Sequence, residues 1–299
     1  MQQELLIAIF TGLGGMLGWG FADFFAKKTI DKIGDVTTLF WSQLFGLVPL
    51  SILFFLSHPY IPQKITTFWP YVIILGAWTG LSYIPVYVAF RKGKVSLISP
   101  IQATYSAIVI IVSAVFFHEI IPISRQIDFL IIFIGVLFIK INIQDLLSVF
   151  SGKAIQKREE IKGLKEIIFA TLLYAVWIIA LEKFINGEYW LPYLFAIHLI
   201  SATSIYLYAV FRKINLKFKD GSLWKSLVII GFCDIFAFGS FYYGLSKTSY
   251  VSIVVMLSSA FSLPTIILAH FFLKERITKT QMIAAITIIA GVMAISFLN

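Results

Sequence analysis

The sequence predicts an all-α integral membrane protein of ten transmembrane helices arranged as two inverted five-helix repeats. Hydrophobic residues make up 59% of the 299 positions, whereas charged residues make up only 13%. A water-soluble domain usually has roughly a quarter of its residues charged. The mean hydropathy of +0.91 therefore indicates a chain whose main solvent is lipid. Ten spans of about 20 residues would use most of the chain, so we expect short loops and no soluble catalytic domain.

The apolar runs define the expected spans. They are residues 5–26, 37–57, 68–90, 95–117, 124–142, 166–184, 189–211, 223–245, 250–273 and 279–298. The N-terminal run follows no basic segment, so we interpret it as the first span and not as a cleaved signal peptide.

The two halves of the chain resemble each other in sequence. Tyr87 and Lys92 recur 155 positions later as Tyr242 and Lys247. After one inserted residue, the Gly-Val pair at 135–136 recurs 156 positions later. Because five spans is an odd number, the second half must enter the membrane from the opposite side. Inverted repeats of this kind are typical of secondary transporters, with the substrate site between the halves.

Basic residues predict the domain limits and the orientation. The first repeat is expected at 1–142, a basic cytoplasmic connector at 143–165, and the second repeat at 166–299. The connectors that follow odd-numbered spans hold 20 of the 24 lysines and arginines. Positively charged loops stay in the cytoplasm, so both termini should be outside. These lysines flank apolar runs, and we therefore expect the lipid bilayer as a partner and no nucleic acid.

Asp234 is the charged residue that lies nearest the middle of a span. A carboxylate at that depth costs at least ~2.5 kcal/mol, so it should face protein or water and take part in function. His198 and Gln43 occupy equivalent positions in the two repeats and could both line a central cavity. The alternative for each of these residues is a packed polar group that bonds a neighbouring helix.

Aromatic residues at depth complete the candidate site. Rings with a few polar anchors suit amphipathic metabolites or organic cations, although plain bundle packing explains many of them. The predicted substrate-binding residues are Trp19, Gln43, Trp78, Tyr83, Gln102, Tyr105, Trp177, His198, Asp234 and Tyr242. The four histidines lack metal-ligand spacing and Cys233 is the single cysteine, so neither a metal nor a cofactor is expected.

Two further features predict local structure. Gly14 and Gly18 form a G-x-x-x-G pair that lets two helices approach closely. Glu119 and Glu275 lie in tight hairpins and should be structural, each satisfying free amides at the start of the next helix, where negative charge is favoured.

The hairpin elements also form a family pattern. They read His118-Glu119, Gln126 and Gly135-Val136, and then Lys274-Glu275, Gln281 and Gly291-Val292. This pattern resembles the EamA-type family of the drug/metabolite transporter superfamily. The resemblance implies a ten-helix transporter whose central cavity is lined by the third, fourth, eighth and ninth helices, with Tyr83 as a cavity tyrosine. The family's usual mid-helix prolines would fall near Thr104 and Ser259, and here Pro100 and Pro264 lie close by.

We therefore predict a secondary transporter in the cell membrane that exports or exchanges small molecules by alternating access. Amino acids, related metabolites and drugs are the candidate substrates, protons are the candidate coupling ion, and the protein would be a monomer or homodimer. One alternative is a flippase for lipid or lipid-linked sugar. Another is an intramembrane lipid-modifying enzyme, which needs a nucleophile, base or metal cluster that the sequence does not display.

Overall fold

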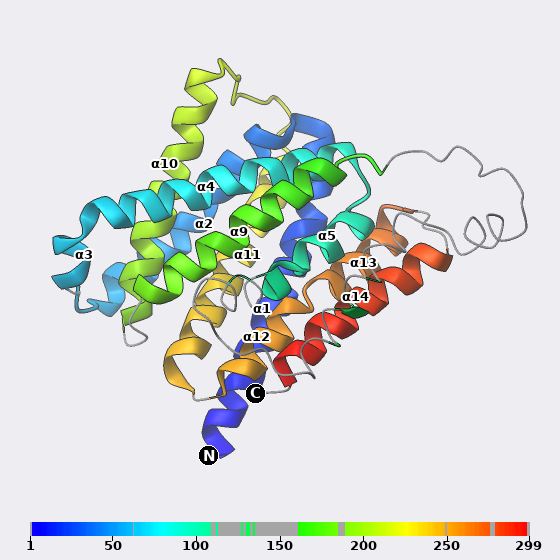
Figure 1. Ribbon diagram of the computed structural model, residues 1–299. Coiled ribbons are helices and arrows are strands. Elements are labelled where there is room, and N and C mark those ends of the chain that lie inside the picture. Colours follow the sequence, from blue (N-terminus) through cyan, green and yellow to red (C-terminus); the bar gives the residue numbers. More distant parts are fainter. Residues whose placement is uncertain are drawn as a thin grey trace, which may run out of the picture.

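The computed structural model describes residues 2–61, 63–108, 161–184, 189–248, 250–275 and 279–297, together with positions 112, 127, 130, 131 and 134. Within these ranges the chain forms helices joined by short loops (Figure 1). The helices are α1 (Gln2–Ile33), α2 (Asp35–Ser57), α3 (Gln63–Thr67), α4 (Trp69–Lys92), α5 (Val95–Ala103), α9 (Leu164–Phe184), α10 (Trp190–Phe211), α11 (Leu223–Lys247), α12 (Val251–Ser259), α13 (Ser262–Phe272) and α14 (Lys279–Phe297).

Six of these helices are long and apolar enough to cross a membrane: α1, α2, α4, α9, α10 and α11. Large apolar side chains such as Phe10, Phe55, Phe169 and Phe271 point outward and are exposed, as expected for contact with lipid. The all-α membrane class is therefore confirmed, whereas the count of ten spans stays a prediction. Most of the expected fifth span and most of the connector at 143–165 lie outside the described residues.

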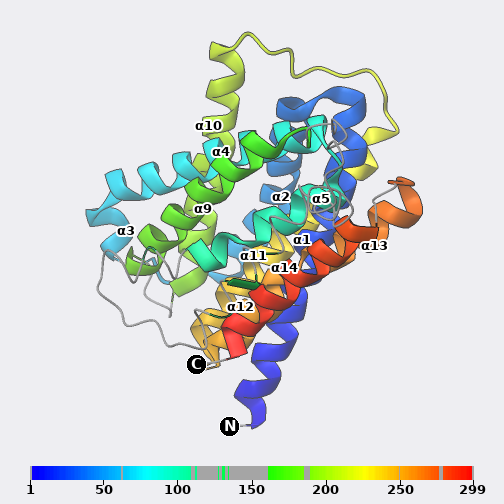
Figure 2. The ribbon, with the colours of Figure 1, turned by 45° about the vertical axis from the view of Figure 1, so that its right-hand side comes forward.

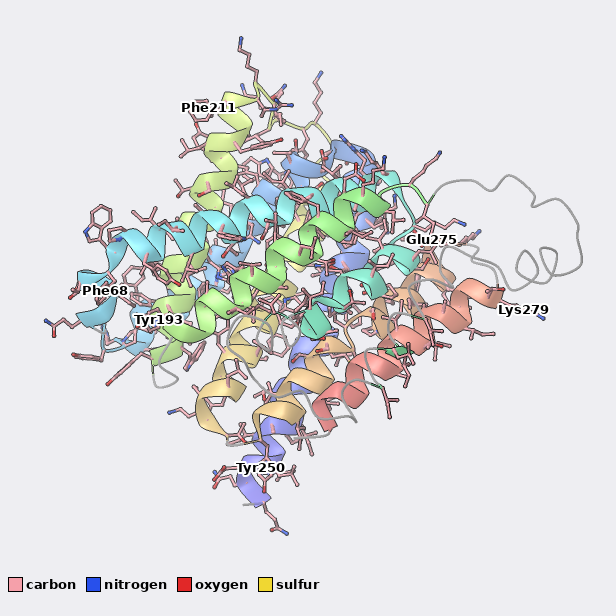
Figure 3. All side chains as sticks on the ribbon, viewed as in Figure 1. Phe68, Tyr193, Phe211, Tyr250, Glu275 and Lys279 are labelled. Carbon is pink, nitrogen blue, oxygen red and sulfur yellow. The ribbon has the colours of Figure 1, made fainter. Side chains whose placement is uncertain are left out.

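The loops gather at two opposite ends of the bundle. Phe68 lies at the left and Tyr250 at the bottom of Figure 3, whereas Phe211 lies at its top and Glu275 and Lys279 lie toward its right-hand side. The start of α1 and the end of α14 lie at the same end as Tyr250 (Figures 1 and 2). We call the opposite end, which carries the loops after α1, α4, α10 and α13, the connector end.

Helices of the first half pack on helices of the second half in matched pairs. The first span of one half contacts the third span of the other, because α1 packs along α11 and α9 packs along α4. Likewise, α2 contacts α11 and α10 contacts α4. Figures 1 and 2 both show α4 and α9 side by side. The centre of the bundle is consequently built by both halves together.

The small residues of α1 allow its close approach to α11. A Cβ atom at Gly18 would lie 2.7 Å from the Cys233 carbonyl oxygen, and one at Gly14 would lie 2.6 Å from Ser240 Oγ. The predicted tight packing at this pair of glycines is confirmed. The contacts also show that the two helices run antiparallel, because residue numbers rise along α1 as they fall along α11.

The fourth and ninth spans are interrupted at equivalent places. α5 ends at Ala103 with a turn at Thr104, whose N–H donates to the Ile101 carbonyl at 3.2 Å. α12 ends at Ser259 and α13 begins at Ser262. Pro264 has no N–H to donate to the Ala260 carbonyl, which instead accepts from Leu263 N at 2.9 Å. Proline thus explains the second break, while Pro100 lies within the continuous part of α5.

Glu275 caps a helix, but a different helix from the one predicted. Its carboxylate accepts hydrogen bonds from the backbone N–H groups of Val95 at 3.1 Å and Ser96 at 3.0 Å, at the start of α5. The expected target was the start of α14. Tertiary packing instead brings the carboxylate to free amides of the other half of the chain. Glu119 lies outside the described residues.

Candidate functional site

Asp234 lies buried at the centre of the bundle and is held by two helices of the first half. Gln43 Nε2 of α2 donates to Asp234 Oδ2 at 3.1 Å, and the Tyr83 hydroxyl of α4 donates to Oδ1 at 3.2 Å. All three side chains are less than a tenth exposed. We call Gln43, Tyr83 and Asp234 the polar centre. Both of its donors are neutral, so they stabilise the carboxylate without cancelling its charge.

The face of α11 that carries Asp234 continues with Phe238 and Tyr242, because residues four apart share one side of a helix. The His198 ring of α10 lies against Phe238 with ring centroids 4.9 Å apart. Trp19 of α1 meets Phe238 edge-on at 5.1 Å. His198, Trp19 and Tyr242 are therefore brought together one to two turns from Asp234, toward the end that holds Tyr250.

A second row of rings runs from the polar centre toward α5. The Tyr174 hydroxyl of α9 donates to the Tyr83 hydroxyl at 3.5 Å. Tyr105, in the turn after the break at Thr104, meets the Tyr174 ring with centroids 5.7 Å apart. Three buried tyrosines thus connect Asp234 with the interruption in the fourth span.

Trp78 and Trp177 hold α4 and α9 together. Trp78 Nε1 donates to the Leu173 carbonyl at 3.1 Å, and Trp177 Nε1 donates to the Leu75 carbonyl at 3.2 Å. Their ring N–H groups are used in helix packing and are not directed at Asp234. Their predicted role in substrate binding remains a prediction.

Several buried polar atoms of the described residues have no hydrogen-bond partner. They include Gln43 Oε1, Gln102 Oε1, His198 Nε2 and the Tyr242 hydroxyl. Buried polar groups are nearly always bonded, so such atoms need an explanation. All four belong to the residues predicted to bind substrate. Each of these atoms could bond a ligand or a water molecule.

The sequence model of the EamA-like transporter family matches residues 6–141 and again residues 161–297. The chain belongs to this family. Its members are multi-pass membrane transporters and not enzymes, which establishes the coarse class of this protein. The family match thus agrees with the membrane location that composition predicted.

Two further comparisons place this EamA-like transporter among known proteins. An uncharacterized protein of Methanocaldococcus jannaschii is 29% identical over 141 residues, which are 46% of this chain and 93% of that protein. A crystal structure superposes with a TM-score of 0.64 at 15% identity, covering 97% of this chain and 96% of that one. At that identity the likeness shows the fold alone, and it extends over nearly the full length.

Three polar residues of the helical bundle, Asp23, Tyr87 and Tyr174, are absent from the sequence-predicted set of binding residues. Asp23 of α1 accepts a hydrogen bond from Ser99 Oγ of α5 at 3.0 Å. It lies near the end of the expected first span, but α1 extends to Ile33 and so places Asp23 well inside the helix. The signal that could have found it is a lone carboxylate in apolar sequence, as for Asp234.

Two cavities open elsewhere on the described surface. One of about 450 Å³ is lined by Lys32, Lys217, Lys219 and Asp220 at the connector end. The other, of about 350 Å³, is lined mainly by phenylalanines of α1 and α13. Neither is lined by the residues of the polar centre. Among the described residues, no group of three or more His, Cys, Asp or Glu side chains could hold a metal ion.

Proposed function

We propose that this EamA-like transporter is a secondary transporter that exports or exchanges small metabolites by alternating access around Asp234. Amino acids, related compounds and drugs are its substrate range. The observation that carries the proposal is the buried Asp234 carboxylate of α11, bonded by Gln43 and Tyr83 from the other half. A movement of one half against the other would break and re-form these bonds. Access to the central site would therefore be coupled to whether the carboxylate is protonated.

The packing of the helices supports such a movement. The matched pairs α1 with α11 and α9 with α4 are the arrangement expected of two inverted repeats. The interruptions at Thr104 and Ala260 divide the fourth and ninth spans into shorter segments. Broken helices beside a central site allow one segment to shift while the other stays packed.

Protons are the coupling ion that Asp234 suits best. Its carboxylate has two neutral donors and no salt-bridge partner among the described residues. An isolated buried carboxylate favours its neutral form, whereas exposure to water favours ionisation. Alternating exposure would therefore let one residue take up and release a proton in each cycle.

The test is flux in proteoliposomes that contain the purified full-length protein. A screen of amino acids, nucleosides and amines under an imposed pH gradient should identify a substrate whose accumulation follows the gradient. Asp234→Asn keeps the size of the side chain and should fold, but should lose the dependence on the gradient. Asp31→Asn, an exposed carboxylate of α1 paired with Lys27, is the matched control. Unchanged pH dependence in Asp234→Asn would overturn the proposal.

A further inference from the structure

The end of α1 carries two exposed lysines on one face. Lys28 and Lys32 are four residues apart, so they lie on the same side of the helix. Their neighbour Lys27 differs from them, because its Nζ pairs with Asp31 Oδ1 at 2.8 Å. In the part of the chain that the structure describes, neither Lys28 nor Lys32 forms an ion pair. This face of α1 therefore presents positive charge at the connector end.

An apolar groove between α1 and α13 reaches Lys28. It is the cavity of about 350 Å³, and besides Lys28 it is lined by Phe21, Phe24, Phe25, Leu268, Phe272 and Leu273. Phe24 is buried, and its ring meets that of Phe272 with centroids 5.9 Å apart. Phe21 and Phe272 are exposed, so the groove opens outward, where the bundle meets lipid. Lys28 is the charged residue of this lining.

A basic cavity begins one helical turn beyond the groove. It is the cavity of about 450 Å³, and Lys32, Lys217 and Lys219 line it. Since Lys28 and Lys32 are only one turn of about 5.4 Å apart, the groove and the basic cavity adjoin along α1. Asp220 is the carboxylate of this lining, and it already accepts hydrogen bonds from the Ser222 N–H at 2.9 Å and the Ser222 hydroxyl at 2.7 Å. Three lysines thus face one carboxylate, and the cavity keeps a net positive charge.

The loop between α10 and α11 holds two of these lysines in place. Trp41 Nε1 donates to the Leu216 carbonyl at 2.8 Å, and the Trp41 ring meets that of Phe218 with centroids 6.1 Å apart. Leu216 and Phe218 are half-buried, whereas the alternate residues Lys217 and Lys219 are exposed. The apolar side chains therefore fix the loop to the bundle, and the lysines occupy its outer face.

Trp224 indicates the depth of the basic cavity in the membrane. It follows Leu223, which lines that cavity, and its ring is 39% exposed and packs on Phe218 with centroids 4.8 Å apart. Tryptophan side chains are enriched at the boundary between headgroups and hydrocarbon. The cavity therefore lies at headgroup depth. The groove extends from Lys28 toward the middle of α1 and so into the hydrocarbon.

We infer that these two adjoining cavities bind an anionic phospholipid, with an acyl chain in the groove and the phosphate at Lys28 and Lys32. Lys217 and Lys219 complete the positive side of the headgroup site, because ammonium groups donate strong hydrogen bonds to phosphate oxygens. A zwitterionic phospholipid would bring its own cationic group against these lysines. A free phosphate would leave the apolar groove unfilled.

The predicted orientation agrees with such a ligand. The connector end is expected to face the cytoplasm, and basic residues near that membrane surface are attracted by the anionic lipids of the leaflet. The site lies apart from the polar centre, since neither cavity is lined by Gln43, Tyr83 or Asp234. The inference therefore goes beyond the proposed function and does not depend on which substrate is transported.

The experiment compares dioleoylphosphatidylglycerol with dioleoylphosphatidylcholine, which share acyl chains and differ in headgroup charge. The purified full-length protein in neutral detergent is titrated with each lipid and with inorganic phosphate. Bound lipid is counted by native mass spectrometry, and stabilisation is measured as the shift in unfolding temperature. We expect the phosphatidylglycerol to be retained and to stabilise more than the phosphatidylcholine, and inorganic phosphate to have no such effect. Equal retention of the two lipids would contradict the inference, as would equal stabilisation by inorganic phosphate.

Paired substitutions assign the preference to this site. Lys28→Gln with Lys32→Gln should lower affinity for the phosphatidylglycerol about tenfold or more and leave the phosphatidylcholine nearly unaffected. Lys162→Gln with Lys165→Gln is the matched control, because these exposed lysines lie at the start of α9 and line neither cavity. An unchanged preference in the first pair overturns the inference, and so does an equal loss in the control pair.

Two further variants keep the test decisive where the α1 pair lowers folded yield. Lys217→Gln with Lys219→Gln alters only outward side chains of the loop and should also weaken the preference for the anionic lipid. Leu268→Trp places a larger ring in the groove and should lower binding of both lipids. Full binding in both of these variants would exclude the site. None of these readouts uses a transported substrate, so failure here leaves the proposed transport function standing.

Discussion

The polar centre and the connector end handle charge in opposite ways. At the connector end, Arg91 Nη1 lies 3.3 Å from Asp35 Oδ1, Lys92 bonds Glu166, and Glu275 caps α5. Each of these charges meets an opposite charge or the free amides of a helix N-terminus. At the polar centre, Asp234 meets only neutral donors. The comparison teaches that charges at the connector end hold helices together, whereas the charge at the centre has only neutral donors, as the proposed transport role requires.

The orientation of the protein in the membrane decides which aqueous side the connector end faces. Labelling of single thiols should report this orientation as an all-or-none difference. In a Cys233→Ser background, Lys219→Cys places a thiol on the exposed loop between α10 and α11, and Tyr60→Cys places one after α2. A membrane-impermeant maleimide added to intact cells should label the second thiol and spare the first. The reverse pattern would turn the connector end outward and overturn the orientation predicted from loop charge.

Removal of the Glu275 cap should give the largest loss of stability. Glu275→Ala leaves the N–H groups of Val95 and Ser96 without their acceptor. Loss of such a cap typically costs about 1–2 kcal/mol. We expect a lower yield of folded protein and a lower unfolding temperature in detergent, with little change in flux per folded molecule. Normal yield with abolished flux would assign Glu275 to transport and erase the distinction between the two regions.

Tyr83→Phe tests the polar centre with a smaller expected effect. The ring stays in place between Tyr87 and Tyr174, and the change removes only the hydroxyl that donates to Asp234. A typical intramolecular hydrogen bond contributes a net stabilisation of about 0.5–1.5 kcal/mol, part of which water can replace when the site opens. The substrate concentration for half-maximal flux should therefore rise several-fold, while folded yield is kept. Tyr206→Phe, which alters an exposed ring on α10, is the matched control.

The Lys92–Glu166 pair should give the smallest effect. Its side chains are 46% and 26% exposed, and exposed ion pairs contribute about 1 kcal/mol or less. Glu166→Gln should lower the unfolding temperature slightly and leave flux unchanged. The charge swap Lys92→Glu with Glu166→Lys should recover the stability that either single reversal removes. A single change that blocked transport would show that this pair also belongs to the transport mechanism.

Local patterns were enough to predict the membrane class and several contacts. Charged residues are rare in the apolar runs, and a carboxylate in mid-span must find donors, so Asp234 stood out. The G-x-x-x-G pair at Gly14 and Gly18 predicted a close helix approach, which the structure confirms. The repeat places Gln43 and His198 at equivalent positions of the two halves. Gln43 bonds Asp234 of α11, and the His198 ring lies against Phe238 of the same helix.

Contacts between distant segments could not be read from such patterns. Glu275 was assigned to the nearest helix N-terminus in sequence, but the available amides belong to α5, 179–180 residues away. The first span was expected at 5–26, which puts Asp23 near its end, whereas α1 runs from Gln2 to Ile33 and puts Asp23 well inside the helix. Whether Trp78 and Trp177 aim their N–H groups at a site or at a neighbouring backbone depends on how α4 and α9 cross.

The sequence by itself determined that this protein lies in a lipid bilayer, that it is helical and that it belongs to this transporter family. These properties depend on composition and on periodic or repeated residues, which are local. Only the tertiary structure decided which atoms around Asp234 are paired and which are not. The physical reason is that hydrogen-bond partners are set by helix register and crossing between the two halves. A shift of one turn would give Asp234 different neighbours without changing any feature visible in the sequence.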